Sequence, residues 1–265
     1  MMARRALPFV LVAALSAVLS VSPHVEAREA GAVPPVAAAS AFRFAPSQPG
    51  VREAYIVSFG LFGGQSVFES EARGAAGILS QRLAEAQAVV RFNTKRGGTA
   101  TPAALAAALK AAGQAMDPSK DVLVAALTSH GSPDGLAVNA GRRAGVLSPP
   151  MLKHMLDASG ARYRVVIVSA CYSGVFASEL ADPRTLVITA ASADRPSFGC
   201  QDGATWTYFG DAFYNQALRG QASLDAAFAQ AKSLVTERER HEGFEPSNPQ
   251  IAGGAEVLAL LARRR

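Results

Sequence analysis

His130 and Cys171 are the two residues whose types and settings best fit covalent chemistry. Each follows an apolar run rich in Val, Leu or Ile: residues 122–127 lead into His130, and residues 163–169 lead into Cys171. A cysteine is the side-chain nucleophile that needs least activation, and a neutral imidazole can take up its proton and later protonate a leaving amine. Gly131 allows a sharp bend, so its N–H and that of Cys171 are candidate oxyanion donors. This pair predicts nucleophilic catalysis.

The elements that must position this pair follow from the alternation of strand and helix patterns. The two apolar runs are typical of strands buried on both faces of a parallel sheet, whose carboxyl ends share one edge. Strands are expected at residues 54–59, 88–92, 122–127, 163–171 and 185–190, with a short hairpin partner at 135–138. Helices are expected at 68–86, 102–112, 148–157, 175–180, 208–218 and 224–239, with a weaker one at 257–262. This α/β order predicts a mainly parallel sheet covered by helices on both faces.

Each reactive residue also has a plainer interpretation. A single buried Cys is usually a small core residue, and a single His is usually a satisfied polar or surface residue. The chain has two cysteines, Cys171 and Cys200, and in an exported protein an even number also allows a disulfide, which would silence the thiol. The paired context favours catalysis, whereas His24, His154 and His241 lack such a setting.

The amino-terminal region has the pattern of a targeting segment. Arg4 and Arg5 precede an apolar stretch at residues 7–21, and Val25-Glu26-Ala27 fits a signal-peptidase site. We therefore expect a signal peptide at 1–27, an Ala/Pro-rich linker or pro-segment at 28–50 and a catalytic domain at 51–265. This organisation predicts a periplasmic or secreted protein without stable membrane association once the signal is cleaved.

Composition excludes several other classes of function. The formal net charge is +5, the arginines are scattered, and the one dense basic cluster stands at residues 263–265, so nucleic-acid binding has little support. The glycine-rich turn at residues 60–64 lacks the Gly-Lys-Ser/Thr ending of a phosphate-binding loop, and a tight turn bordering the active edge is its expected role. No Cys/His cluster has metal-ligand spacing. We expect no metal and no cofactor.

Three ordered motifs resemble the legumain family of cysteine peptidases, within the caspase-like clan. They are Thr128-Ser129-His130-Gly131-Ser132 followed by Gly135, then Ser169-Ala170-Cys171-Tyr172-Ser173-Gly174, and finally Ser197-Phe198-Gly199-Cys200 with Thr207-Tyr208-Phe209-Gly210-Asp211. The likeness spans most of residues 52–252. It implies a caspase-like three-layer α/β/α sandwich.

The resemblance also implies roles for individual residues. His130 would be the catalytic base, Cys171 the nucleophile and Gly131 a contributor to the oxyanion site. Asp211 and Ser197 match positions that line the pocket for the side chain preceding the scissile bond. Taken alone, these two residues would be an acid near a helix start and a loop hydroxyl.

The chain departs from the family pattern where substrate preference is set. Ser169 stands where plant and animal legumains carry an acid, Ser129 stands where they carry Asp, and Val67-Phe68 stands where they carry Arg-His. Ser169 therefore remains a substrate-binding candidate with altered chemistry. Without the arginine, a basic substrate side chain facing Asp211 becomes possible, and the preferred residue stays open.

The sequence thus predicts an exported cysteine endopeptidase that acts on peptides or proteins through a thioester. Two alternatives remain. A peptide ligase would use the same pair of residues with an amine in place of water, and a non-catalytic caspase-like binding module would leave Cys171 unreactive.

Overall fold

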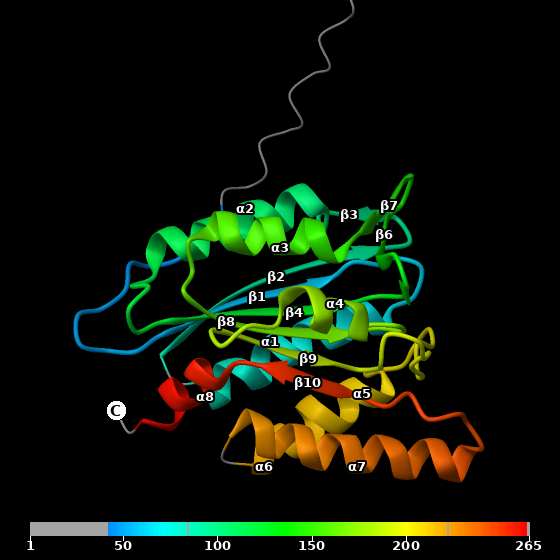
Figure 1. Cartoon of the computed structure of the whole chain (residues 1–265). Helices are drawn as coiled ribbons and strands as arrows, with labels where there is room; N and C mark the ends of the chain where they lie inside the picture. The colour runs from blue at the N-terminus through cyan, green and yellow to red at the C-terminus, as the bar shows by residue number, and fades with distance from the viewer. Residues whose placement is uncertain (1–41, 84, 222, 264–265) are drawn as a thin grey trace, which may run out of the picture. The chain divides into compact units, whose positions relative to one another are not determined.

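A seven-stranded sheet runs through the part of the chain that the computed structural model describes, residues 42–83, 85–221 and 223–263 (Figure 1). In spatial order its strands are β10 (Gln250–Gly253), β9 (Thr185–Thr189), β8 (Tyr163–Ser169), β4 (Val122–Thr128), β1 (Ala54–Gly60), β2 (Ala86–Thr94) and β3 (Gly97–Gly98). The five central strands are parallel, and only the edge strands β10 and β3 pair antiparallel. The expectation of a mainly parallel sheet is confirmed.

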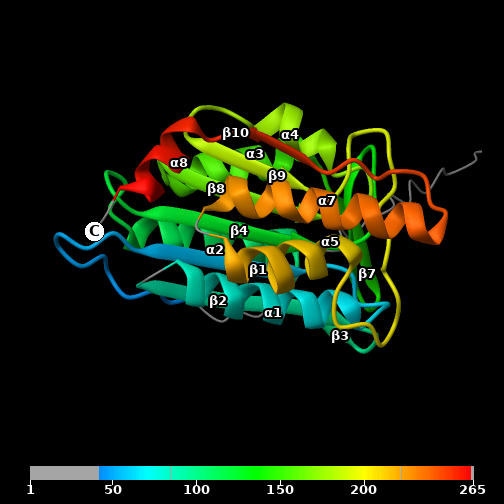
Figure 2. The same ribbon diagram turned by 90° about the horizontal axis from the view of Figure 1, so that it is seen from below.

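Helices cover both faces of this sheet (Figure 2). One layer holds α2 (Pro102–Ala115), α3 (Pro149–Ser159) and α4 (Gly174–Leu180). The opposite layer holds α1 (Val67–Arg82), a continuous helix over residues 208–220, α7 (Leu224–Glu242) and α8 (Ala255–Ala262). The result is the predicted three-layer α/β/α sandwich.

Strand alternation explains why the apolar runs build two cores. In β1, Tyr55, Val57 and Phe59 point into the core beneath α2 and α3, whereas Ile56 points into the core beneath α1 and α7. Successive side chains of a strand face opposite sides of the sheet, so a continuous apolar run is needed when both faces are covered. The same alternation holds in β4 and β8.

The helix boundaries agree with the local signals. Thr101 caps α2 by accepting a hydrogen bond from the N–H of Ala104 at 3.2 Å, with Pro102 at the first helical position. Ser148 caps α3 in the same way through the N–H of Met151. These caps satisfy backbone donors that a helix start leaves without partners.

Several short elements lie outside the predicted pattern. The strands β10, β3 and β7 (Arg143–Leu147) are brief and rich in glycine or polar residues, so their sequences show no alternation of apolar and polar residues that would predict a strand. β7 pairs with β6 (Gly135–Ala140), and β6 pairs with β5 (Gly131–Ser132), giving a second, three-stranded sheet in the described residues. The helix over 208–220 begins as α5 (Tyr208–Gly210), widens into a π-helical segment (Asp211–Ala217) and ends as α6 (Leu218–Gly220).

Part of the segment 28–50 packs on the body of the domain, and residues 28–41 lie outside the described residues, as does the predicted signal peptide. The rings of Phe44 and Tyr55 meet edge to face at 5.6 Å between centroids, and the guanidinium of Arg91 stacks on Phe42. Residues 42–50 therefore form a strap along the domain. No helix in the described part of the chain is both long and apolar enough to cross a membrane.

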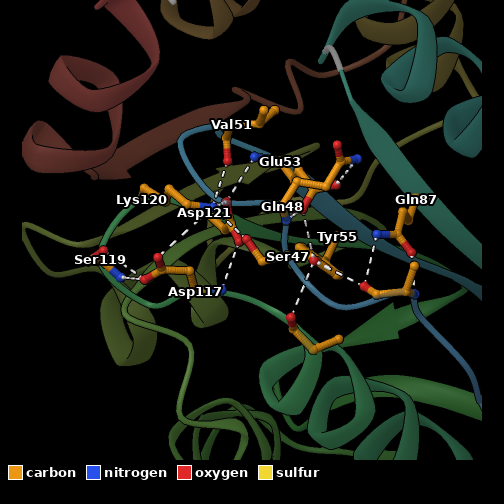
Figure 3. Close-up of polar contacts among 12 residues, drawn as sticks. Ser47, Gln48, Val51, Glu53, Tyr55, Gln87, Asp117, Ser119, Lys120 and Asp121 are labelled. Atoms are coloured by element: carbon orange, nitrogen blue, oxygen red, sulfur yellow. Dashed lines mark hydrogen bonds and ion pairs between the residues drawn. The ribbon is translucent and has the colours of Figure 1, made fainter.

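A polar network centred on Lys120 fixes this strap at the amino-terminal edge of the sheet (Figure 3). The Lys120 ammonium donates to the Ser47 hydroxyl, to the Val51 carbonyl at 2.6 Å and to the Asp121 carboxylate at 3.2 Å. The fully buried Asp121 also accepts the N–H of Glu53 at 2.9 Å. Because Asp121 precedes β4 and Glu53 precedes β1, the network ties the starts of two central strands to the strap.

Lys120→Met should lower the free energy of unfolding by about 1–3 kcal/mol, because it removes three donor contacts and leaves the Asp121 carboxylate without its cation. Urea denaturation measures this change. Lys153→Met is the matched control, since the Lys153 pair with Asp157 is exposed and such pairs contribute about 1 kcal/mol or less. Equal stabilities of the two variants would contradict a structural role for the network.

Candidate active site

The register of two neighbouring strands brings His130 and Cys171 to the same edge of the sheet. β4 and β8 pair in parallel, with Thr128 opposite Ser169 at their carboxyl ends. His130 and Cys171 each follow two residues after these positions. The strands therefore place His130 and Cys171 at equal distances beyond one paired end, which agrees with the expectation that they share one edge of the sheet.

The Cys171 thiol is held by the backbone of Ser197. The sulfur accepts the N–H of Ser197 at 3.2 Å, and the thiol donates to the Ser197 carbonyl at 3.3 Å. The Cys171 side chain is only partly buried, while Ser197 is buried. Ser197, predicted as a pocket residue, thus lies against the nucleophile through its main chain.

Gly131 is required by close packing against the nucleophile. A Cβ added at Gly131 would lie 2.0 Å from the carbonyl oxygen of Cys171, so a side chain there would displace the backbone of the active site. The residue after the nucleophile, Tyr172, has a left-handed backbone with φ of 55°. Such a conformation is costly for a non-glycine residue and is found mainly where the surrounding structure and function enforce it.

His130 lies in an aromatic enclosure that keeps its imidazole neutral. The rings of Phe62 and Phe68 meet it edge to face, at 4.6 and 5.0 Å between centroids. Burial lowers the pKa of His130 below its usual value near 6.5, because the charged form loses hydration. The ring is therefore an unprotonated base at neutral pH.

Gln65 sets the tautomer of this base. Its side-chain nitrogen donates to the Cys200 carbonyl at 3.2 Å, and its side-chain oxygen lies 2.6 Å from Nε2 of His130. With the amide oriented in this way, the oxygen accepts the Nε2 proton and leaves the lone pair on Nδ1. Gln65 thus orients the imidazole as a base acting through Nδ1.

Gln65 was not among the predicted site residues. It stands at the end of the glycine-rich turn, which the sequence analysis expected to border the active edge and which the structure places there. A polar side chain after that turn was the available signal. The contact itself spans 65 positions, so local sequence patterns do not reveal it.

The second cysteine, Cys200, is partly buried, as Cys171 is. Both thiols are free in the structure. Burial raises the pKa of Cys200 to about 12, with smaller contributions from the charges of Cys171 and Glu71. Cys200 is therefore a neutral, protected thiol at neutral pH, since the thiolate is the reactive form.

Two predicted substrate-binding residues, Ser169 and Asp211, have other contacts in the structure. Ser169 is buried, and its hydroxyl lies 3.0 Å from that of Thr207. The Asp211 carboxylate accepts from the amides of Asn215 at 2.8 Å and Gln216 at 2.9 Å, within its own helix. The contacts described for their side chains do not join either residue to the Cys171 thiol.

At the positions that depart from the family pattern, the side chains are apolar or form a hydrogen bond to the backbone. Val67 and Phe68 are fully buried at the start of α1, where Phe68 packs on the His130 ring. The Ser129 hydroxyl, also buried, donates to the Ala137 carbonyl and so ties the residue before the base to β6. These residues support the base and add no charge beside it.

A cavity of about 350 Å³ lies next to Gln65 at this edge. Its wall includes Glu69 and the ion pair of Lys95 with Asp202, whose atoms are 2.6 Å apart. A larger cavity, about 450 Å³, lies at the opposite edge beside the start of β1, away from both reactive residues. Among the described residues, no group of three or more His, Cys, Asp or Glu side chains could hold a metal ion.

The comparisons with known proteins place this arrangement in a family. The model of the Peptidase C13 family, the legumain family of cysteine peptidases, matches residues 104–254, more than half of the chain and a span that includes both His130 and Cys171. The chain belongs to this family. No curated protein sequence matches the chain.

Solved structures agree with the family at the level of fold. Caspase-1 from Spodoptera frugiperda is similar with a TM-score of 0.53 and 12% sequence identity, over 80% of this chain and 94% of that one. At this identity the likeness concerns the fold, which is caspase-like. Peptidase C13 membership and the caspase-like fold support a cysteine peptidase.

Gln65→Glu should raise the pKa of His130 by about one unit or more, because a carboxylate facing Nε2 stabilises the imidazolium. NMR titration of the His130 ring protons measures the shift without a substrate. Gln65→Met, which fills the space without an acceptor, is the control and should not raise the pKa. An unchanged titration in Gln65→Glu would show that residue 65 does not face Nε2 in solution.

Native protein treated with iodoacetamide should be alkylated at Cys171 and spared at Cys200, since desolvation raises the pKa of Cys200 to about 12 and keeps its thiol protonated. Intact mass should rise by one adduct in the wild type and in Cys200→Ser, and stay unchanged in Cys171→Ala. After unfolding, the wild type should accept two adducts. Equal native reactivity of the two thiols would contradict the burial assigned to Cys200.

Proposed function

We propose that this cysteine peptidase is an exported endopeptidase in which Cys171 attacks the peptide carbonyl and His130 is the base. The observation that supports the proposal is the paired end of β4 and β8, which brings a partly exposed thiol and a half-buried, neutral imidazole to the same edge of the sheet. Gln65 supports the same assignment, because it holds the imidazole in the tautomer that has a free lone pair on Nδ1.

The proposed reaction has two steps. The Cys171 thiol gives its proton to His130, its sulfur bonds to the carbonyl carbon, and collapse of the tetrahedral intermediate breaks the C–N bond as His130 protonates the leaving amine. Water, deprotonated by His130, then attacks the thioester and releases Cys171 as a thiol. A positioned base typically supplies a factor of about 10²–10⁴ in rate.

The oxyanion site is assigned to Gly131. Its backbone packs against the carbonyl of Cys171, so its N–H would be one oxyanion donor and the N–H of Cys171 the second. Before a substrate can react, the thiol must exchange its contact with the Ser197 carbonyl for the base. Binding of a peptide along Ser197 would drive this exchange.

Substrate selection is assigned to Ser197 and Asp211, following the family pattern, while the predicted Ser169 is buried against Thr207 and would act on the substrate only through its neighbours. Loss of the family's arginine, with buried Val67 in its place, makes this region less basic and leaves room for a basic side chain near Asp211. Export is proposed from the signal-peptide pattern at 1–27. The partners are peptides or proteins, without nucleic acid.

Hydrolysis is preferred to a binding role because the structure leaves Cys171 free and partly exposed. A ligase would share the thioester and differ only in the acceptor. Product masses measured with and without an added amine nucleophile separate hydrolysis from ligation.

Cleavage-site profiling with a peptide library tests the proposal. Wild type should cut within peptides, Cys171→Ala should lose activity to background, and His130→Ala should lose about 10²-fold or more. His154→Ala, which changes an exposed histidine on α3, is the matched control and should retain wild-type turnover. Equal turnover by wild type and Cys171→Ala would refute the nucleophile assignment.

A further inference from the structure

Glu71 is a carboxyl group sealed beneath the active edge. It lies on α1, one turn after Val67, and no part of it is exposed. One oxygen, Oε2, accepts the N–H of Thr207 at 2.8 Å, while Oε1 has no hydrogen-bond partner in the structure. None of the ion pairs among the described residues involves Glu71, so no cation offsets its charge.

The carboxyl group joins the segment that holds the nucleophile to the strand that carries it. Thr207 follows the loop that starts at Ser197, and its hydroxyl lies 3.0 Å from the hydroxyl of Ser169, two residues before Cys171. The same hydroxyl accepts the N–H of Gly210 at 2.9 Å. Glu71 therefore contacts the far end of a loop whose near end binds the Cys171 sulfur.

The residues around the contact between Glu71 and Thr207 are closely packed. A Cβ added at Gly210 would lie 2.0 Å from Oε2 of Glu71, so only glycine lets the helix start approach the carboxyl group this closely. The void beside Glu71, lined by Ser58, Thr128 and Tyr214, has no room for a water molecule. The carboxyl group must be satisfied by protein atoms alone.

We infer that Glu71, as a neutral carboxylic acid, is a positioning residue that fixes residues 197–207 against the end of β8 and thereby sets the position of Ser197 on the nucleophile. The inference rests on the proposed function for its catalytic consequence only. Its structural part, a protonated acid that holds Thr207, stands by itself.

Electrostatics agrees with the neutral state. Burial raises the pKa of Glu71 above its usual value, and the hydrogen bond from the Thr207 N–H only partly counters this effect. The other titratable groups that face it are Cys200 and Tyr214, whose pKa values are raised in part by the charge of Glu71. Both are neutral at neutral pH, and a partnerless Oε1 costs less free energy in a protonated carboxyl group than in an ionised one.

The sign of the pH dependence follows from the raised pKa. In the unfolded chain Glu71 ionises near its ordinary value, so the stability it contributes is complete below that value and is lost as pH rises through the folded pKa. The same ionisation places an unpaired charge under the Ser197 loop. Activity should therefore fall as pH rises through the folded pKa of Glu71, and the alkylation rate of Cys171 should rise less steeply with pH than in Glu71→Gln.

Glu71→Gln, Glu71→Ala and Ser58→Ala form the test set. Glutamine keeps a neutral acceptor for Thr207 and adds a donor, so Glu71→Gln should flatten the decline of stability with rising pH. Glu71→Ala should lower kcat/KM by about 10- to 100-fold, as misplacement of reacting groups does, and Glu71→Gln should recover most of that loss. Ser58→Ala removes a buried hydroxyl beside the same void that bonds only to Ala72 and should change neither profile.

Two measurements separate this inference from the proposed function. Urea unfolding as a function of pH and the alkylation rate of Cys171 need no peptide substrate, so they decide the role of Glu71 even if no peptide is cleaved. If Glu71→Ala is too unstable to purify, Thr207→Val breaks the link to Ser169 and should slow the reaction in the same direction. A stability profile of Glu71→Gln that matches wild type, or full activity and alkylation rate in Glu71→Ala or Thr207→Val, would overturn the inference.

Discussion

The active site depends first on the pairing of β4 with β8. Thr128 lies opposite Ser169, so the two strands end in register. His130 follows two residues after Thr128, and Cys171 follows two residues after Ser169. A shift of one residue would turn every side chain of one strand to the other face and place the base or the nucleophile in the wrong layer. The alternating burial of both strands between two helical layers prevents such a shift.

Aromatic rings surround His130, whereas backbone groups hold the sulfur of Cys171. Phe62 and Phe68 partly desolvate His130 and so favour its neutral form, while Gln65 fixes which nitrogen bears the proton. The sulfur of Cys171 is held by backbone groups only. Few charges lie near the pair, so the site relies on burial and orientation. The buried apolar residues Val67 and Phe68, which stand where the sequence comparison with legumains expects Arg-His, add no charge there.

The sequence predicted those features that arise from local pattern. Continuous apolar runs announced β1, β4, β8 and β9, and reactive residues at the ends of two of them indicated the site. The contact of Gln65 with His130 and that of Glu71 with Thr207 escaped prediction, because each joins residues distant in sequence through the shape of a turn or helix start. Ser169 matched a pocket position by its likeness to the family, but in the structure it is buried and its hydroxyl lies 3.0 Å from that of Thr207. β10 was missed because a four-residue edge strand that follows Pro249 and ends in Gly253 has no measurable period.

The loop after Ser197 reaches both halves of the catalytic pair. Its first residue, Ser197, donates a backbone hydrogen bond to the Cys171 sulfur. The carbonyl of Cys200, three residues later, accepts from the Gln65 amide that contacts the imidazole. The loop continues into the exposed residues Gln201, Asp202 and Gly203. Because both contacts belong to one short loop, any displacement of residues 197–200 would move the Cys171 thiol and the Gln65 amide together.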